Sequence, residues 1–189
     1  MENQITIDKT SVLEAYKHAS EEQKKIMENL FGKDVLLPKD ITERIRTFHD
    51  AVVLLGYDNQ TVIDYHKLNH IDSSKGVIAY AKLRIIAEAL NEGWKPKFDN
   101  GEQRYYPWFF IYQDEEYKEF NEDEKKGIFE FTRSYNNLNT LCGIVFVHAG
   151  NDCSHTNSGY GFRLALKTKE LAEYCGRKFI DIWADYLFV

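Results

Sequence analysis

The chain has 189 residues, 43% hydrophobic and 14% aromatic, which is enough for one buried core and argues against intrinsic disorder. Its formal net charge of −6 excludes a globally basic surface for nucleic acid, although a local basic patch stays compatible with it. The three cysteines are an odd number without a framework spacing. They favour free thiols in a reducing cytosol over a secreted disulfide scaffold.

The N-terminal stretch MENQITIDKTSVLEAYK lacks the apolar run of a signal peptide. No segment reaches the roughly 18 uninterrupted apolar residues of a membrane span. We therefore expect a cytoplasmic protein that makes no membrane contact.

Two capping boxes, at 11–14 and 20–23, predict two short helices or one kinked helix over about 11–31, with Gly32 as the stop. After Pro38 an apolar stripe predicts a further helix from Asp40 to Gly56.

Residues 57–72 are ambiguous, with a short helix expected around 61–68. The clearest helix runs from Ser74 to Glu92 and is closed by Gly93. Because it is apolar nearly all the way round, we expect neighbours to bury it at the centre of the molecule.

The sequence pattern changes from helical to strand-like after a turn signal at 99–101. The acidic stretch DEEYKEFNEDEKK is expected to be a solvated loop, and Thr168 to cap one helix that runs close to the C-terminus. Strands are predicted at 104–113, about 127–134, 141–148 and 161–167.

This order indicates an α+β fold: N-terminal helices and a central buried helix packed on a small antiparallel sheet of about four strands, closed by a C-terminal helix. We expect one domain over 1–189, with 1–37 a helical segment that can be semi-independent.

The stretch RYYPWFFIYQ presents aromatic side chains on both faces of a strand. One face carries Tyr106 and Trp108, followed by Phe110 and Tyr112. Pro107 cannot donate to a ladder, so the strand is expected near a sheet edge. Its second face is covered either by the chain itself or by a partner, since tyrosine and tryptophan are enriched in interface cores.

Three stretches together resemble a known group of sequences: HASEEQKKIMENLFGKDV, KLRIIAEALNEGWKPKFDNGEQRYYPWF and GFRLALKTKELAEYCGRKFIDIWADYLF. They resemble an uncharacterised protein family of Bacteroides phages, prophages and mobile elements, over nearly the whole chain. The resemblance implies no catalytic residues. It implies a phage- or element-encoded protein that works in a bacterial host cytoplasm or in a virion, with residues 149–160 the part in which such proteins differ most.

The segment VHAGNDCSHTNSGYG gathers metal-ligating residue types at His148, Asp152, Cys153 and His155. Their spacing matches no standard zinc pattern, and a polar hairpin loop explains the same composition. A Cys153–His155 nucleophile pair is the weaker alternative, because such pairs are usually assembled from distant segments with a third orienting group.

Arg163 and Lys167 are expected on one face of the 161–167 strand. Beside Tyr106 and Trp108, these cations are candidates for holding a phosphate or carboxylate, while the aromatic rings stack a base. An ordinary solvent face is the alternative interpretation. Arg104 and Arg133, also on predicted strands, would enlarge such a basic–aromatic face.

Other catalytic patterns are weak or missing. His66 and His70 share a helical spacing without the glutamate of the H-E-x-x-H motif, so surface histidines explain them better. No phosphate-binding, dinucleotide-binding or G-x-S-x-G motif is present, and no cofactor is expected.

We therefore predict a non-enzymatic interaction protein that acts through an aromatic surface, either by self-association into a homo-oligomer or by binding a host or phage protein. The alternatives are a small-ligand or nucleotide-binding protein and, second, a metal-dependent enzyme. The net charge disfavours nucleic acid as the partner.

Overall fold

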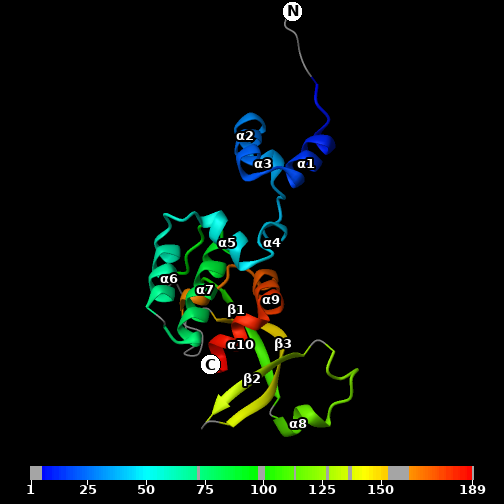
Figure 1. Cartoon of the computed structure of the whole chain (residues 1–189), viewed down its shortest axis with the longest axis vertical. Helices are drawn as coiled ribbons and strands as arrows, with labels where there is room; N and C mark the ends of the chain where they lie inside the picture. The colour runs from blue at the N-terminus through cyan, green and yellow to red at the C-terminus, as the bar shows by residue number, and fades with distance from the viewer. Residues whose placement is uncertain are drawn as a thin grey trace, which may run out of the picture. The chain divides into compact units, whose positions relative to one another are not determined.

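The chain folds into two compact units, Met1–Arg44 and Ile45–Val189 (Figure 1). The computed structural model describes residues 6–71, 73–97, 101–112, 114–126, 128–135, 138–152 and 162–188. No helix among them is long and apolar enough to cross a membrane.

The secondary structure described in the first unit consists of helices joined by short non-helical segments. Its helices are α1 (Lys9–His18), α2 (Glu21–Phe31), α3 (Lys33–Leu36) and α4 (Ile41–Arg44). The capping box at Ser20 is confirmed, because its backbone N–H donates to the Gln23 Oε1 and its hydroxyl accepts from the Gln23 N–H. The box predicted at Ser11 is wrong: Asp8 is the N-cap, and its carboxylate accepts from the Ser11 N–H at 2.8 Å.

The second unit is built around α7 (Lys75–Leu90), whose burial confirms the expected central helix. Packed against it are α5 (Phe48–Leu55), α6 (Gln60–His70) and α10 (Ile180–Phe188). The buried residues of α7 are Ala79, Ala81, Leu83, Ile85, Ile86, Ala87, Ala89 and Leu90. The many alanines let neighbouring helices approach closely, and Gly93 follows the helix at φ +86.

The residues described in this unit also form an antiparallel sheet, with strand order β1-β3-β2. The strands are β1 (Arg104–Tyr112), β2 (Phe129–Tyr135) and β3 (Leu138–Asp152). β1 is therefore an edge strand, as Pro107 predicts. The α+β class is confirmed, with three strands among the described residues and a helix at the C-terminal end.

The predicted strand at 161–167 is wrong. Phe162–Leu164 forms a 3-10 helix, η1, and only Leu166 makes a bridge, to Tyr105. Leu164, Ala165 and Leu166 are all buried, so the segment has no alternation of inner and outer faces. Its backbone bonds to the Asn91 side chain and to Tyr105 rather than to a ladder.

Local signals also divide helices that the apolar stripes predicted as continuous. The expected helix from Asp40 to Gly56 is two helices, because a capping box of Thr47 with Asp50 begins α5 anew. The helix capped by Thr168 ends as α9 (Lys169–Lys178), and α10 follows after the non-helical, buried Phe179.

The acidic stretch after β1 contains α8 (Asp114–Glu119), so the prediction of a continuous solvated loop is wrong there. Tyr117 explains the difference. Its ring is buried against the backbone of Gly143, and its hydroxyl donates to Glu130 at 2.8 Å. One buried aromatic residue thus attaches an otherwise charged segment to the sheet.

Candidate functional site

The two faces of β1 meet different surroundings. Toward the C-terminal helices, Pro107 and Phe146 lie against the backbone of Gly176 in α9. Phe109 packs on Trp183 of α10, with ring centroids 5.4 Å apart. Gly176 leaves room for this contact, since any side chain there would overlap Phe146 and Pro107. This face is core.

On the opposite face the exposure changes along the strand. Tyr106 is 1% exposed, whereas Trp108 is 45% exposed and Phe110 is 52% exposed. The chain itself therefore covers Tyr106 but leaves Trp108 and Phe110 open to solvent. Tyr106 and Trp108 share a strand face, yet they belong to different environments.

A β-bulge in β3 shapes this face. The β1–β3 register pairs Trp108 with His148 and Phe109 with Phe146, which leaves Val147 as the extra residue. Val147 is 52% exposed, and His148 is exposed as well. We call Trp108, Phe110, Val147 and His148 the aromatic surface.

Trp108 is held in place within this surface. Its indole stacks on the His148 imidazole, with centroids 5.7 Å apart and planes 11° apart. It also covers Gly150, where any side chain would overlap the indole. A large apolar ring that is half exposed and held on two sides needs little ordering when it binds a partner.

Further aromatic contacts support Phe110. Its ring lies 4.8 Å from Tyr112, and Tyr112 in turn meets Phe120 edge-on at 4.8 Å. Phe120 lies beside Tyr117 of α8, which is buried. The row is thus covered at its α8 end and exposed from Phe110 to Trp108.

The predicted basic–aromatic face does not assemble as expected. Arg104 is buried and its Nη1 donates to the Lys97 carbonyl at 3.0 Å. The Lys167 ammonium pairs with Glu92 at 3.0 Å, and its backbone N–H donates to Asn91. Arg163 is exposed in η1, and the side chain of Arg133 lies outside the described residues. The bonds made by Arg104 and Lys167 are structural.

Only some of the candidate metal ligands belong to the described part of the chain, which ends at residue 152 in β3 and resumes at 162. His148 is in β3, where it stacks on Trp108. The Asp152 side chain, Cys153 and His155 lie outside the described residues. Within the described ranges no group of three or more histidine, cysteine, aspartate or glutamate side chains is placed to hold a metal ion.

Other reactive groups serve packing. Burial raises the pKa of the Cys175 thiol to about 12, which keeps it protonated at physiological pH. His66 of α6 stacks on Tyr57, with centroids 6.3 Å apart. Asp185 forms an ion pair with Lys75, with the carboxylate Oδ1 and the ammonium Nζ 2.6 Å apart.

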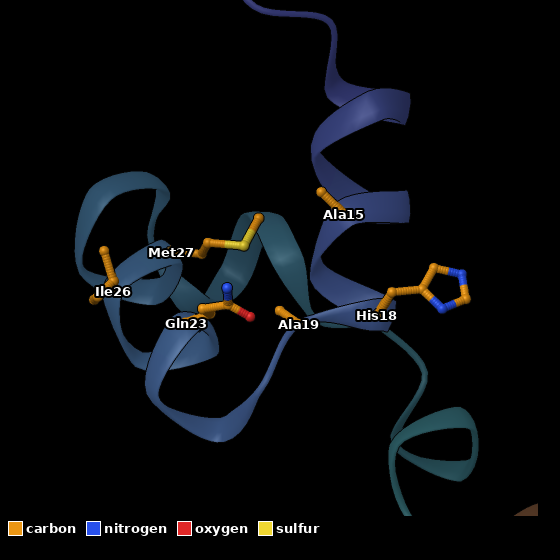
Figure 2. A pocket seen from close by; sticks show the side chains of 6 residues that line it. All are labelled: Ala15, His18, Ala19, Gln23, Ile26 and Met27. Atoms are coloured by element: carbon orange, nitrogen blue, oxygen red, sulfur yellow. The ribbon is translucent and has the colours of Figure 1, made fainter.

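The first unit contains a hollow of about 320 Å³ between α1 and α2 (Figure 2). It is lined by Ala15, His18, Ala19, Gln23, Ile26 and Met27. The lining is mostly apolar, with one imidazole and one amide, and it contains no carboxylate or ammonium. This chemistry suits apolar contact better than catalysis.

Comparison of the chain with protein-family models, with curated proteins and with solved structures gave no match. The geometry of the chain itself therefore carries the functional assignment.

The sequence pattern places Phe110 on the same strand face as Trp108. It indicates His148 only as a candidate metal ligand, and it does not predict the exposure of Val147. The signal available was the glycine at 150, which permits close approach of a ring. The bulge that exposes Val147 has no local signature.

Proposed function

We propose that the protein is a non-enzymatic interaction protein that binds another protein surface through its aromatic surface. The observation that carries this proposal is the exposure of Trp108 and Phe110 on one face of β1, together with the exposed Val147 at the facing bulge of β3, with Trp108 held between His148 and Gly150. Contiguous exposed apolar side chains on a rigid element are typical of interaction sites.

We place this role in the cytoplasm of a bacterial host or in a virion, as a phage- or mobile-element-encoded protein. That setting rests on the resemblance of the three sequence stretches, and it makes a host or phage protein, or a second copy of the chain, the expected partner. A nucleotide-binding role has less support, because Arg104 and Lys167 are already engaged within the fold.

Photo-crosslinking tests the proposal. A benzophenone amino acid is placed at Phe110 and, as a control, at Ile71, which is exposed at the end of α6. We expect the Phe110 probe to crosslink a defined protein in cells that express the chain, and the Ile71 probe to give only background.

Competition with variants completes the test. Trp108→Ser should abolish the crosslink from Phe110, whereas Tyr57→Ser, an exposed aromatic outside the aromatic surface, should leave it unchanged. Crosslinking that is absent at Phe110, or equal at Phe110 and Ile71, would show that the aromatic surface does not bind protein.

A further inference from the structure

The sheet face that carries the aromatic surface continues past Phe110 to α8. Tyr112 of β1 pairs with Gly143 of β3, and Gly143 pairs in turn with Glu130 of β2, so these three residues share that face. Tyr117 of α8 lies over Gly143, and its hydroxyl donates to Glu130 at 2.8 Å. The aromatic surface is therefore bordered at its α8 end by a buried tyrosine and an exposed carboxylate.

Negative charge is concentrated at this end of the sheet. Residues 114–130, which we call the acidic border, contain eight carboxylates and three lysines, a formal charge of −5, whereas the whole chain carries −6. The exposed carboxylates include Glu115 and Glu119 of α8 and Glu130 of β2. The aromatic surface itself contributes no carboxylate, ammonium or guanidinium group. A molecule that covers Phe110 and extends toward α8 therefore meets an apolar area and then an acidic one.

The lysines of the acidic border leave most of its charge unbalanced. Three lysines cannot neutralise eight carboxylates, and Lys125 and Lys126 form ion pairs with Glu122 and Asp123 in the turn after α8. The Lys125 ammonium also lies over the Tyr117 ring, 5.2 Å from its centroid. A cation of this segment thus contacts an aromatic ring and a carboxylate at the same time.

Arg177 repeats this arrangement on the core side of the sheet. Its guanidinium lies over the Phe146 ring, 5.0 Å from the centroid, and its Nη2 is 4.0 Å from the Glu173 Oε2. A guanidinium group suits such a position because it is planar and weakly hydrated, so it stacks on a ring while its N–H groups donate to a carboxylate. The combination of exposed rings and nearby carboxylates at the α8 end offers the same contacts to an arginine from another molecule.

We propose that the aromatic surface binds a cationic segment of a partner protein. Arginine side chains of that segment stack on Trp108 and Phe110, and adjacent basic residues pair with carboxylates of the acidic border. This inference rests on the proposed function and specifies the chemical class of the partner. Charge complementarity carries it, because the acidic border attracts a cationic segment and repels nucleic acid and other phosphate-rich molecules.

Fluorescence anisotropy with a defined probe tests the charge of the partner. The probe is a short labelled peptide in which arginine alternates with leucine, and the comparison peptide has glutamate in place of every arginine. We expect the whole chain to bind the arginine peptide at least about tenfold more tightly at low salt. The affinity should fall as salt is added, because screening weakens ion pairs. Equal affinity for the two peptides would overturn the inference.

Matched charge variants locate the contact. Glu115→Gln combined with Glu119→Gln should weaken binding of the arginine peptide about fivefold, because two charges of the acidic border are lost. Glu22→Gln combined with Glu43→Gln removes two exposed charges from the first unit and should leave the affinity unchanged. Trp108→Ser should also weaken binding, since it removes a stacking ring. Circular dichroism checks that each variant is folded. Equal effects of the two charge variants, or no effect of Trp108→Ser, would show that the peptide does not bind here.

The crosslink from Phe110 separates this inference from the proposed function. Mass spectrometry of the crosslinked product identifies the segment of the partner that lies at Phe110, and we expect that segment to be rich in arginine or lysine. A neutral or acidic segment would overturn the inference and leave the proposed function intact. A Phe110 probe that captures no protein would overturn both.

Discussion

The first unit and the second unit are stabilised in different ways. In α1 and α2 no residue is buried. The capping bonds at Asp8 and Ser20 and the ion pairs Lys17–Glu14 and Lys24–Glu21 each join residues three apart. The bond between the two helices runs from the Tyr16 hydroxyl to Glu28 at 2.6 Å. Burial and this bond raise the pKa of Tyr16.

The second unit is joined by contacts between distant parts of the chain. The Asn91 amide donates to the carbonyl of Ala165, and the Tyr174 hydroxyl donates to the carbonyl of Ile45 at 2.6 Å. Asn59 and Thr61 both donate to Glu88 of α7. From this difference we expect the second unit to unfold cooperatively, and the loss of a local contact in α1 or α2 to destabilise only that part of the chain.

The largest effect is expected from the core of the second unit. Trp183→Ala removes a 1% exposed indole that packs on Phe109, and should lower the free energy of unfolding by about 3–5 kcal/mol. Trp108→Ala is the matched control and should cost about 1 kcal/mol, because that ring is half exposed. Urea unfolding followed by circular dichroism measures both, and equal losses would contradict the difference in burial between Trp183 and Trp108.

The buried polar connection at Asn91 comes next. Its side chain donates to Ala165 at 2.9 Å and accepts from the Lys167 N–H at 3.0 Å, so Asn91→Ala leaves both backbone groups without this partner. We expect a loss of about 1–3 kcal/mol. Asn121→Ala, which removes bonds in an exposed turn, should have a smaller effect in the same unfolding experiment.

Removing a cap in the first unit should have a smaller and local effect. Ser20→Ala breaks the capping box of α2 and should destabilise that helix by about 1 kcal/mol. Hydrogen exchange should become faster in α2 while the amides of α7 keep their protection. Ser20→Asp retains an N-cap acceptor and should restore protection; faster exchange across both units would show that they unfold together.

The smallest effect concerns Cys175 and depends on pH. Burial raises the pKa of its thiol from the ordinary 9.0 to about 12, so the folded state favours the protonated form. The resulting stabilisation is fully present below about pH 9 and is lost as pH rises toward 12. At about pH 8 we expect iodoacetamide to modify Cys175 only after unfolding, as peptide mass spectrometry can show; modification of the native protein would contradict its burial.

Local chemistry made much of the fold predictable. The box at Ser20, the cap at Thr168 and the stop at Gly32 each act within one turn of a helix, so their effect can be read from neighbouring residues. The apolar circumference of α7 predicted its burial. Because Pro107 has no backbone N–H to donate to a neighbouring strand, the sequence predicted an edge strand there.

The same reasoning failed where distant residues compete for a segment. Residues 162–167 have a strand-like pattern, but Asn91 and Tyr105 take the backbone groups of Ala165, Leu166 and Lys167, and the three consecutive residues Leu164, Ala165 and Leu166 are all buried. The acidic stretch at 114–119 contains a helix because Tyr117 finds a place beside Gly143. Asn91, Tyr105 and Gly143 are all far in sequence from the segments they contact, so no local sequence pattern predicts these contacts.

The sequence by itself determined the α+β class, the central helix and the presence of an aromatic edge strand, since these follow from composition, periodicity and the covalent chemistry of proline. Only the tertiary structure decided which aromatic side chains stay exposed. Tyr106 and Trp108 are chemically similar and share a face, but the first is covered and the second is open beside a bulge. Exposure is set by what packs over a residue, and that depends on the whole chain.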